Sequence, residues 1–144
     1  MTINQLSIFI ENRSGTLVKV LDILKQSGIQ IIASTIADTA EYGIYRLICS
    51  EPSRAYQELK NAGVAVALSD VFALELDNEP GKAADAVRII SDADISITYM
   101  YTFLWGGKGI LIFRTDQTEK AREVILLNQL SFIDETDLAG RGEN

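Results

Sequence analysis

The sequence repeats itself at a constant offset of 66 positions, and this repeat constrains the fold more than any other feature. Residues 8–15 (Ile-Phe-Ile-Glu-Asn-Arg-Ser-Gly) return without a gap at 74–81 (Leu-Glu-Leu-Asp-Asn-Glu-Pro-Gly). The same offset pairs Gly43 with Gly109 and Ala55 with Ala121. Self-similarity of this kind indicates one structural unit used twice. We therefore expect two similar units, residues 1–69 and residues 70–144, rather than one domain.

Each half has the hydrophobic pattern of the order β-α-β-β-α-β. The first helix is predicted from apolar residues spaced i, i+3, i+4 and i+7, at Leu17, Val20, Leu21 and Leu24. The predicted strands are 6–10, 29–37, 44–49 and 64–68, then 71–76, 95–104, 109–114 and 130–133. The predicted helices are 16–27 and 52–62, then 82–93 and 118–127. The order predicts an α+β fold: two ferredoxin-like units whose antiparallel sheets carry both helices on one face.

The junction between the halves shows no flexible linker. Ser69 and Asp70 form the only polar break between Val64 and Leu76. We therefore expect one extended stretch that serves both units, as the last strand of the first and the first strand of the second.

Composition argues against several classes of function. The net charge is −7, so the chain lacks the clustered cations that bind nucleic acid or anionic membranes. There is no histidine, and Cys49 is the single cysteine, so a metal site or a cofactor is not expected. The N-terminus has no basic segment followed by an apolar one, as a signal peptide would. These features favour a cytoplasmic location.

The repeated loop between the first strand and first helix of each half is the best candidate site. Asn12 and Gly15 recur there as Asn78 and Gly81. A helix N-terminus exposes unpaired N–H groups that attract carboxylates and phosphates, and asparagine can donate and accept hydrogen bonds at once. The alternative is an ordinary helix cap or turn, for which asparagine and glycine are also common.

These loops resemble those of the ACT domains, small regulatory units with the βαββαβ order and an Asn-x-x-Gly turn after the first strand. Residues 11–17 (Glu-Asn-Arg-Ser-Gly-Thr-Leu) are similar to the Glu-Asn-Arg-Pro-Gly-Val-Leu form of the serine-controlled phosphoglycerate dehydrogenases. Residues 77–81 (Asp-Asn-Glu-Pro-Gly) resemble the same turn and keep its proline. The resemblance covers nearly the whole chain, once in each half.

The resemblance implies a sensor of amino acids whose ligand sits between two ACT units. One unit supplies the loop and the other the start of its second strand. Where the dehydrogenase pattern has a histidine two positions before the loop asparagine, this chain has Ile10 and Leu76, so the pockets would suit an apolar or aromatic ligand. The ligand-binding residues implied are Asn12, Arg13, Ser14, Gly15, Thr16, Leu17, Gln30, Ile31, Asn78, Glu79, Pro80, Gly81, Ser96, Ile97 and Tyr99.

The two halves also differ in ways that bear on the site. The second strand of the second half carries aromatic residues at every alternate position, where the first half has small ones: Tyr99, Tyr101, Phe103 and Trp105 against Ala33, Thr35, Ala37 and Thr39. Alternation places each set on one face. The aromatic set serves either core or interface packing, or lines a pocket through Tyr99 or Tyr101. Arg13 and Glu79 could recognise a carboxylate and an ammonium group, or could simply be solvated.

Two functions follow, from different classes. The first is a stand-alone regulatory protein that binds an amino acid and acts on a separate metabolic enzyme. The second is a structural or interaction subunit of such an enzyme, with the ligand sites lost. A small enzyme on this fold is not expected, because Arg13 and Asn12 are adjacent but lie outside the Gly-rich motif of acylphosphatases. Because exposed sheet edges need covering, we expect a homodimer.

Overall fold

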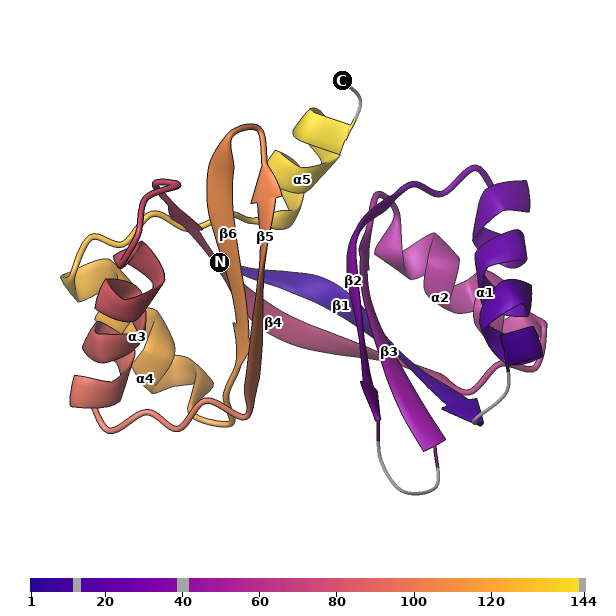
Figure 1. The fold of residues 1–144 in the computed structure, drawn as a ribbon, viewed down its shortest axis with the longest axis horizontal. Coiled ribbons are helices and arrows are strands. Elements are labelled where there is room, and N and C mark those ends of the chain that lie inside the picture. Colours follow the sequence, from indigo (N-terminus) through magenta and orange to yellow (C-terminus); the bar gives the residue numbers. More distant parts are fainter. Residues whose placement is uncertain (12–13, 39–41, 143–144) are drawn as a thin grey trace. The chain divides into compact units, whose positions relative to one another are not determined.

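The computed structural model describes residues 1–11, 14–38 and 42–142 of the 144-residue chain. Its first half contains β1 (Thr2–Glu11), α1 (Ser14–Gln26), β2 (Ile31–Asp38), β3 (Tyr42–Cys49) and α2 (Pro52–Asn61) (Figure 1). Next come β4 (Val66–Leu76), α3 (Lys82–Asp92), β5 (Tyr99–Trp105), β6 (Lys108–Arg114), α4 (Thr118–Leu127) and α5 (Glu135–Gly142). The α+β class is confirmed, and the order β-α-β-β-α is found in both halves. Among these helices, none is both long enough and apolar enough to span a membrane.

The chain divides into two compact units, and each end of the chain belongs to the unit that the opposite half mainly forms. One unit comprises Asn4–Ser69 and Thr136–Asn144, and the other comprises Met1–Ile3 and Asp70–Glu135. Strand β4 runs through the junction without interruption, which confirms the expected extended stretch. The expected ranges 1–69 and 70–144 therefore differ from these units only at the two chain ends.

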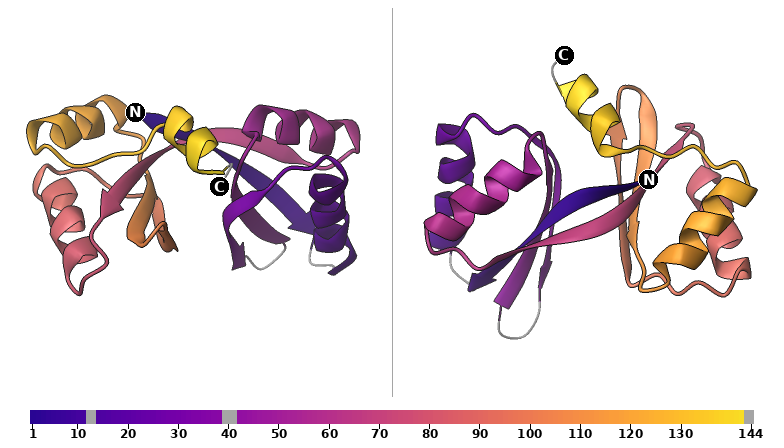
Figure 2. Two further views of the ribbon diagram at one scale, coloured as in Figure 1. Left: turned by 90° about the horizontal axis from the view of Figure 1, so that it is seen from above. Right: turned by 180° about the vertical axis from the view of Figure 1, so that it is seen from behind.

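Each unit has antiparallel strands with two helices on one face. In the first unit β3 lies between β2 and β1, and β1 also neighbours β4. In the second unit β6 lies between β4 and the edge strand β5. Figures 1 and 2 show α1 and α2 together on one side of the first unit's strands, and α3 and α4 together on one side of the second's. This arrangement follows from amphipathic helices burying their apolar stripes against one sheet face.

The two hydrophobic cores occupy equivalent positions, which explains why the repeat tolerates no gap. Every member of the second core lies 66 positions after a member of the first. The equivalent pairs are Leu6 and Phe72, Ile8 and Leu74, Val20 and Ala86, Leu24 and Ile90, Ile29 and Ile95, Tyr45 and Leu111, Leu47 and Phe113, Ala55 and Ala121, and Leu59 and Ile125. Much of the sequence repeat therefore consists of residues that pack in equivalent hydrophobic cores.

Equivalent residues of the two cores differ in side-chain volume, but an increase at one position is offset by a decrease at a neighbouring one. Leu6 faces Leu47 across β1 and β3, whereas Phe72 faces Phe113 across β4 and β6 with ring centroids 5.1 Å apart. The extra volume of the two phenylalanines is offset nearby, because Ala86 stands where the first core has Val20. Such exchange keeps both interiors close-packed.

The structure corrects three sequence predictions. The strand expected at 130–133 is wrong: only Leu74 and Phe132 form a bridge, flanked by the hydrogen bonds Glu75 N–H to Ser131 C=O and Ile133 N–H to Ala73 C=O. The strand expected from Ile95 begins only at Tyr99. Helix α5 was not expected at all, because its short, glycine-containing sequence has no clear apolar stripe.

Candidate functional site

The loop that joins β4 to α3 is shaped by a proline–glycine turn. Its five residues are 77–81, and the Lys82 N–H approaches the Glu79 carbonyl at 3.4 Å. Gly81 has φ 88° and ψ −10°, the values required of the third residue of a type II turn. Proline is common at the second residue of such turns, and Pro80 occupies that position. Because an L side chain rarely adopts this φ, glycine is needed at position 81. The turn places Asn78 ahead of the first turn of α3.

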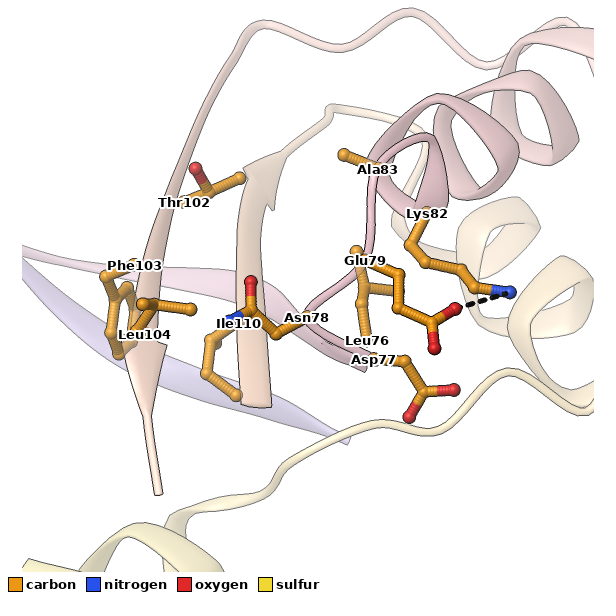
Figure 3. Close-up of a pocket in the computed structure, with 11 residues that line it drawn as sticks. Leu76, Asp77, Asn78, Glu79, Lys82, Ala83, Thr102, Phe103, Leu104 and Ile110 are labelled. Carbon is orange, nitrogen blue, oxygen red and sulfur yellow. Dashed lines mark ion pairs between the residues drawn. The ribbon is translucent and has the colours of Figure 1, made fainter. Parts of the chain in front are cut away.

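A pocket of about 330 Å³ opens beside this loop, at the end of the sheet near the start of α3 (Figure 3). This volume is at the lower end of the range for small-molecule sites. The residues lining it come from the loop, the start of α3, the end of β5 and the start of β6: Leu76, Asp77, Asn78, Glu79, Lys82, Ala83, Thr102, Phe103, Leu104, Gly109 and Ile110. An apolar floor is thus combined with a few polar groups.

Asn78 is the polar side chain best placed for a ligand. In Figure 3 it extends from the loop toward Ile110 of β6. It has no hydrogen-bond partner among the residues that the structure describes. Helix α3 also starts without a side-chain cap at Gly81, and the N–H groups of a first helical turn have no partner within the helix. Asn78 and the helix start together suit a ligand that carries both an acceptor and a donor.

The charged side chains around the pocket form two ion pairs. The Lys108 Nζ donates to Asp77 Oδ1 at 2.7 Å and so ties the loop to the hairpin between β5 and β6. This hydrogen bond, with the attraction of the two charges, lowers the pKa of Asp77 and raises the pKa of Lys108. Glu79 Oε2 lies 4.0 Å from Lys82 Nζ (Figure 3). All four side chains are exposed, so the pairs position the loop more than they stabilise the fold.

The hairpin that carries Lys108 has a tight two-residue turn. Gly106 and Gly107 both have positive φ, 59° and 79°, as a type I′ turn requires. This turn sets Lys108 opposite Trp105 in the register of β5 and β6. The loop and the hairpin therefore meet at one end of the sheet, where Leu76 and Leu104 both pair with Gly109.

The comparisons with known proteins agree with this architecture. The sequence matches the ACT domain pair family over residues 1–141. The chain belongs to this family. A crystal structure of a protein from Bacteroides thetaiotaomicron is 34% identical, with a TM-score of 0.90 and 96% of each chain covered. The curated proteins include no match.

More distant relatives share the fold of this ACT pair. The regulatory subunit of aspartate kinase from Thermus thermophilus is 14% identical, with a TM-score of 0.60, and covers 86% of this chain and 91% of its own. The corresponding subunit from Thermus flavus is 15% identical, with a TM-score of 0.56, and covers 86% and 90%. At this identity the likeness is one of fold.

The structure brings only part of the expected ACT site together. In the second unit, Asn78 and Glu79 line the pocket, while Pro80 and Gly81 form the turn beside it. In the first unit, Asn12 and Arg13 lie outside the described residues. Ser14 begins α1, and Gly15 is an exposed helical residue without positive φ. The two repeats therefore differ at the start of the helix, because residues 14–15 are helical whereas the equivalent residues 80–81 form a turn before α3.

The first unit has a different pocket. It measures about 250 Å³ and is lined by Phe9, Glu11, Thr16, Lys19, Gly63, Val64 and Ala65. Thr16 is the one predicted site residue among them, since Leu17 instead packs against the first core. The Lys19 Nζ donates to the Ala62 carbonyl at 3.0 Å.

The starts of the second strands lie away from the loops of their own units. Leu104 is level with Leu76, so Tyr99 lies five residues, or about 17 Å, further along β5. In the first unit Ile31 pairs with Cys49, at the far end of β3 from Gly43. Gln30 and Ser96 are exposed, and Ile97 packs on the second core.

Side chains of the neighbouring loops form hydrogen bonds with backbone groups at these strand starts. The Ser96 N–H donates to Gln117 Oε1 at 2.8 Å, and Gln117 Nε2 donates to the Asp94 carbonyl at 3.1 Å. The Gln30 N–H donates to Ser50 Oγ at 3.0 Å. In both repeats a loop side chain thus accepts a hydrogen bond from the backbone ahead of the second strand.

The aromatic stripe of β5 lies on the face opposite the helices. Tyr101 and Phe103 pair with Ile112 and Ile110, whereas Leu111 of β6 belongs to the core beneath α3 and α4. Phe103 reaches the pocket, but Tyr99 and Tyr101 do not line it. The packing interpretation of the stripe therefore fits this unit better than the pocket interpretation.

Sequence reasoning missed most of the pocket wall. Thr102, Leu104 and Ile110 lie far from the loop in sequence and reach it only through the strand register, whereas Ala83 follows the loop at the start of α3. One signal was available: Gly109, which the repeat matches with Gly43, marks the point where β6 meets Leu76. Among the described residues, no group of three His, Cys, Asp or Glu side chains could hold a metal ion.

Proposed function

We propose that this ACT pair is a stand-alone regulatory protein that binds a free amino acid and has no catalytic activity of its own. The observation that carries the proposal is the pocket at the β4–α3 loop, where the loop asparagine of the ACT pattern, Asn78, faces an apolar cavity at a helix start. A ligand with a carboxylate, an ammonium group and a side chain matches these three features.

The charges around the pocket suit a zwitterion. Lys82 and the first turn of α3 favour a carboxylate, and Glu79 favours an ammonium group. Because Lys82 and Glu79 lie only 4.0 Å apart, each can be drawn toward the opposite charge on a ligand with little movement.

A ligand that also contacts the start of a second strand must bridge two units, because loop and strand start are about 17 Å apart within one unit. A homodimer would supply such unit pairs. Among the described strands, β2 and β5 each pair on one side only, and such edges invite pairing with another chain. Gln30 and Ser96 are the proposed strand-start contacts, and the target is a separate metabolic enzyme.

One observation favours the second candidate, a structural or interaction subunit that binds no ligand. Ile10 and Leu76 are apolar where the related dehydrogenase pattern has a histidine, so a polar side-chain contact to the ligand is lost. In this alternative, the loops would serve only as helix starts.

A thermal-shift screen with the twenty amino acids separates the two candidates. A ligand at about 100 times its Kd adds about 2.7 kcal/mol of stability, which corresponds to a rise on the order of 5–10 °C in Tm. We expect a rise with one or a few amino acids that is lost in Asn78→Ala. Since Asn78 is exposed, this variant should fold normally. No rise with any amino acid would favour the interaction subunit.

A further inference from the structure

We propose that only the second repeat is a working site, and that it takes one free amino acid with an aliphatic side chain per chain. This inference rests on the amino-acid-binding function proposed above and adds the repeat, the stoichiometry and the class of side chain. It is carried by four differences between the repeats, two at residues that line the pocket and two in the loop beside it.

The first difference is at the base of the helix. Ala83 lines the pocket at the first turn of α3, and its equivalent in the first repeat is Leu17. Leu17 packs against the first core, so the space that Ala83 leaves open is of the kind that a leucine side chain fills in the first unit. Both residues pack against their own cores, and the smaller alanine leaves more space beside the loop of the second repeat.

The second difference is on the edge strand. Leu104 is 64% exposed and lines the pocket from β5, and the equivalent position in the first repeat carries Asp38. A carboxylate there would replace the apolar wall with a charged group that an aliphatic ligand cannot satisfy.

The third and fourth differences concern the loop itself. The Asp77–Lys108 pair that ties loop to hairpin cannot form in the first repeat, where the equivalent residues are Glu11 and Tyr42. The type II turn at Pro80 and Gly81 is also specific to the second repeat, because α1 already begins at Ser14. The five-residue loop of the second repeat is therefore held in place, and the first repeat lacks these supports.

The walls of the second-repeat pocket indicate the class of ligand. Leu76, Leu104 and Ile110 are aliphatic, Phe103 is the one aromatic residue of the lining, and the volume of about 330 Å³ is small for a site. Thr102 and Asn78 are neutral polar groups, and Asp77 is already paired with Lys108. The pocket therefore has an apolar surface for a valine-, leucine- or isoleucine-sized side chain and has no unpaired charge dedicated to a charged one.

The test is isothermal titration calorimetry of the full chain with L-valine, L-leucine and L-isoleucine, with L-phenylalanine, L-serine and L-aspartate as contrasts. Wild-type protein should bind an aliphatic amino acid at one per chain. Ala83→Leu should raise Kd about tenfold or more, because it fills the space that the ligand needs. Ala84→Leu makes the same exchange at the next, exposed position of α3, which does not line the pocket, and this matched control should leave Kd unchanged.

A second variant distinguishes a loss of binding from a loss of folding. Leu104→Asp places the first-repeat residue at an exposed position and should also abolish binding while the thermal unfolding curve stays intact. Two ligands per chain, binding that survives Ala83→Leu, or a preference for serine, aspartate or phenylalanine would each overturn the inference while leaving the sensor function standing. Absence of binding by every amino acid would overturn both.

Discussion

Single residues show that the second repeat has changed side chains while keeping the backbone conformation of the first. Gly28 and Gly63 end helices with φ of 69° and 80°, and their equivalents Asp94 and Gln129 keep positive φ, at 59° and 53°. The hydrogen bonds are also kept: Gly63 N–H to Lys60 C=O corresponds to Gln129 N–H to Leu126 C=O. Since an L residue in this region costs roughly 1 kcal/mol, the second unit carries strain that the first avoids.

Gln129→Gly should therefore raise the free energy of unfolding by about 0.5–1 kcal/mol, because glycine adopts this φ without a steric penalty. The side chain of Gln129 is exposed, so little packing is lost. Urea denaturation measures the change. Gly63→Gln is the reciprocal control and should lower stability by a similar amount. A Gln129→Gly protein less stable than wild type would contradict the assigned backbone geometry.

The two loop glycines should respond oppositely to alanine. Gly81→Ala should destabilise by about 1–2 kcal/mol, because alanine must adopt φ 88° at the turn. Gly15→Ala should stabilise by about 0.5–1 kcal/mol, because Gly15 is helical and alanine is the better helix former. Chemical denaturation of both variants provides the comparison. Equal effects would mean that the two repeats have the same loop conformation.

At the level of elements, the ion pair between the β4–α3 loop and the β5–β6 hairpin determines how the second unit responds to pH. Lys108 lowers the pKa of Asp77 below its ordinary 3.8, so this carboxylate contributes stability above that pH and loses it as the pH falls through the lowered pKa. Asp77 raises the pKa of Lys108 above 10.5, so that contribution is present below 10.5 and is lost as the pH rises through the raised pKa.

Lys108→Gln should return the pKa of Asp77 toward 3.8 and weaken ligand binding, because the loop is no longer tied to the hairpin. A carboxyl-carbon NMR titration follows the pKa of Asp77 in both proteins. The exposed Arg88, which pairs with Asp85 on α3, provides a control, since Arg88→Gln should leave the Asp77 titration unchanged. An unshifted Asp77 in the wild-type protein would rule out the ion pair in solution.

Most elements could be predicted because their apolar periodicity reflects the core directly. Leu17, Val20 and Leu24 predicted α1, and each of them packs in the first core. The start of β5 at Tyr99 could not be predicted, because residues 95–98 (Ile-Ser-Ile-Thr) keep the alternating pattern that is typical of a strand. The pocket was predicted only at Asn78 and Glu79, because Thr102 and Leu104 reach it through strand register rather than through a local motif.

At the scale of the whole molecule, the repeat preserves packing more faithfully than it preserves the loops. Every core position of the second unit has an equivalent in the first, whereas residues 80–81 form a turn where the equivalent residues 14–15 are helical. Duplication therefore explains the fold, and divergence of one loop explains a single site. The expected homodimer belongs to this scale, and light scattering should find twice the 15.8 kDa mass of the chain. A monomer mass at micromolar concentration would contradict it.

The most direct test of the account is a ¹H–¹⁵N NMR titration of the full chain with an aliphatic amino acid such as L-leucine. The account predicts that amide shifts concentrate at residues 77–83 and 102–110, which contribute the pocket. They should saturate at one ligand per chain. Shifts concentrated instead at the first-repeat loop or in the first-unit pocket, or no shifts with any amino acid, would contradict it.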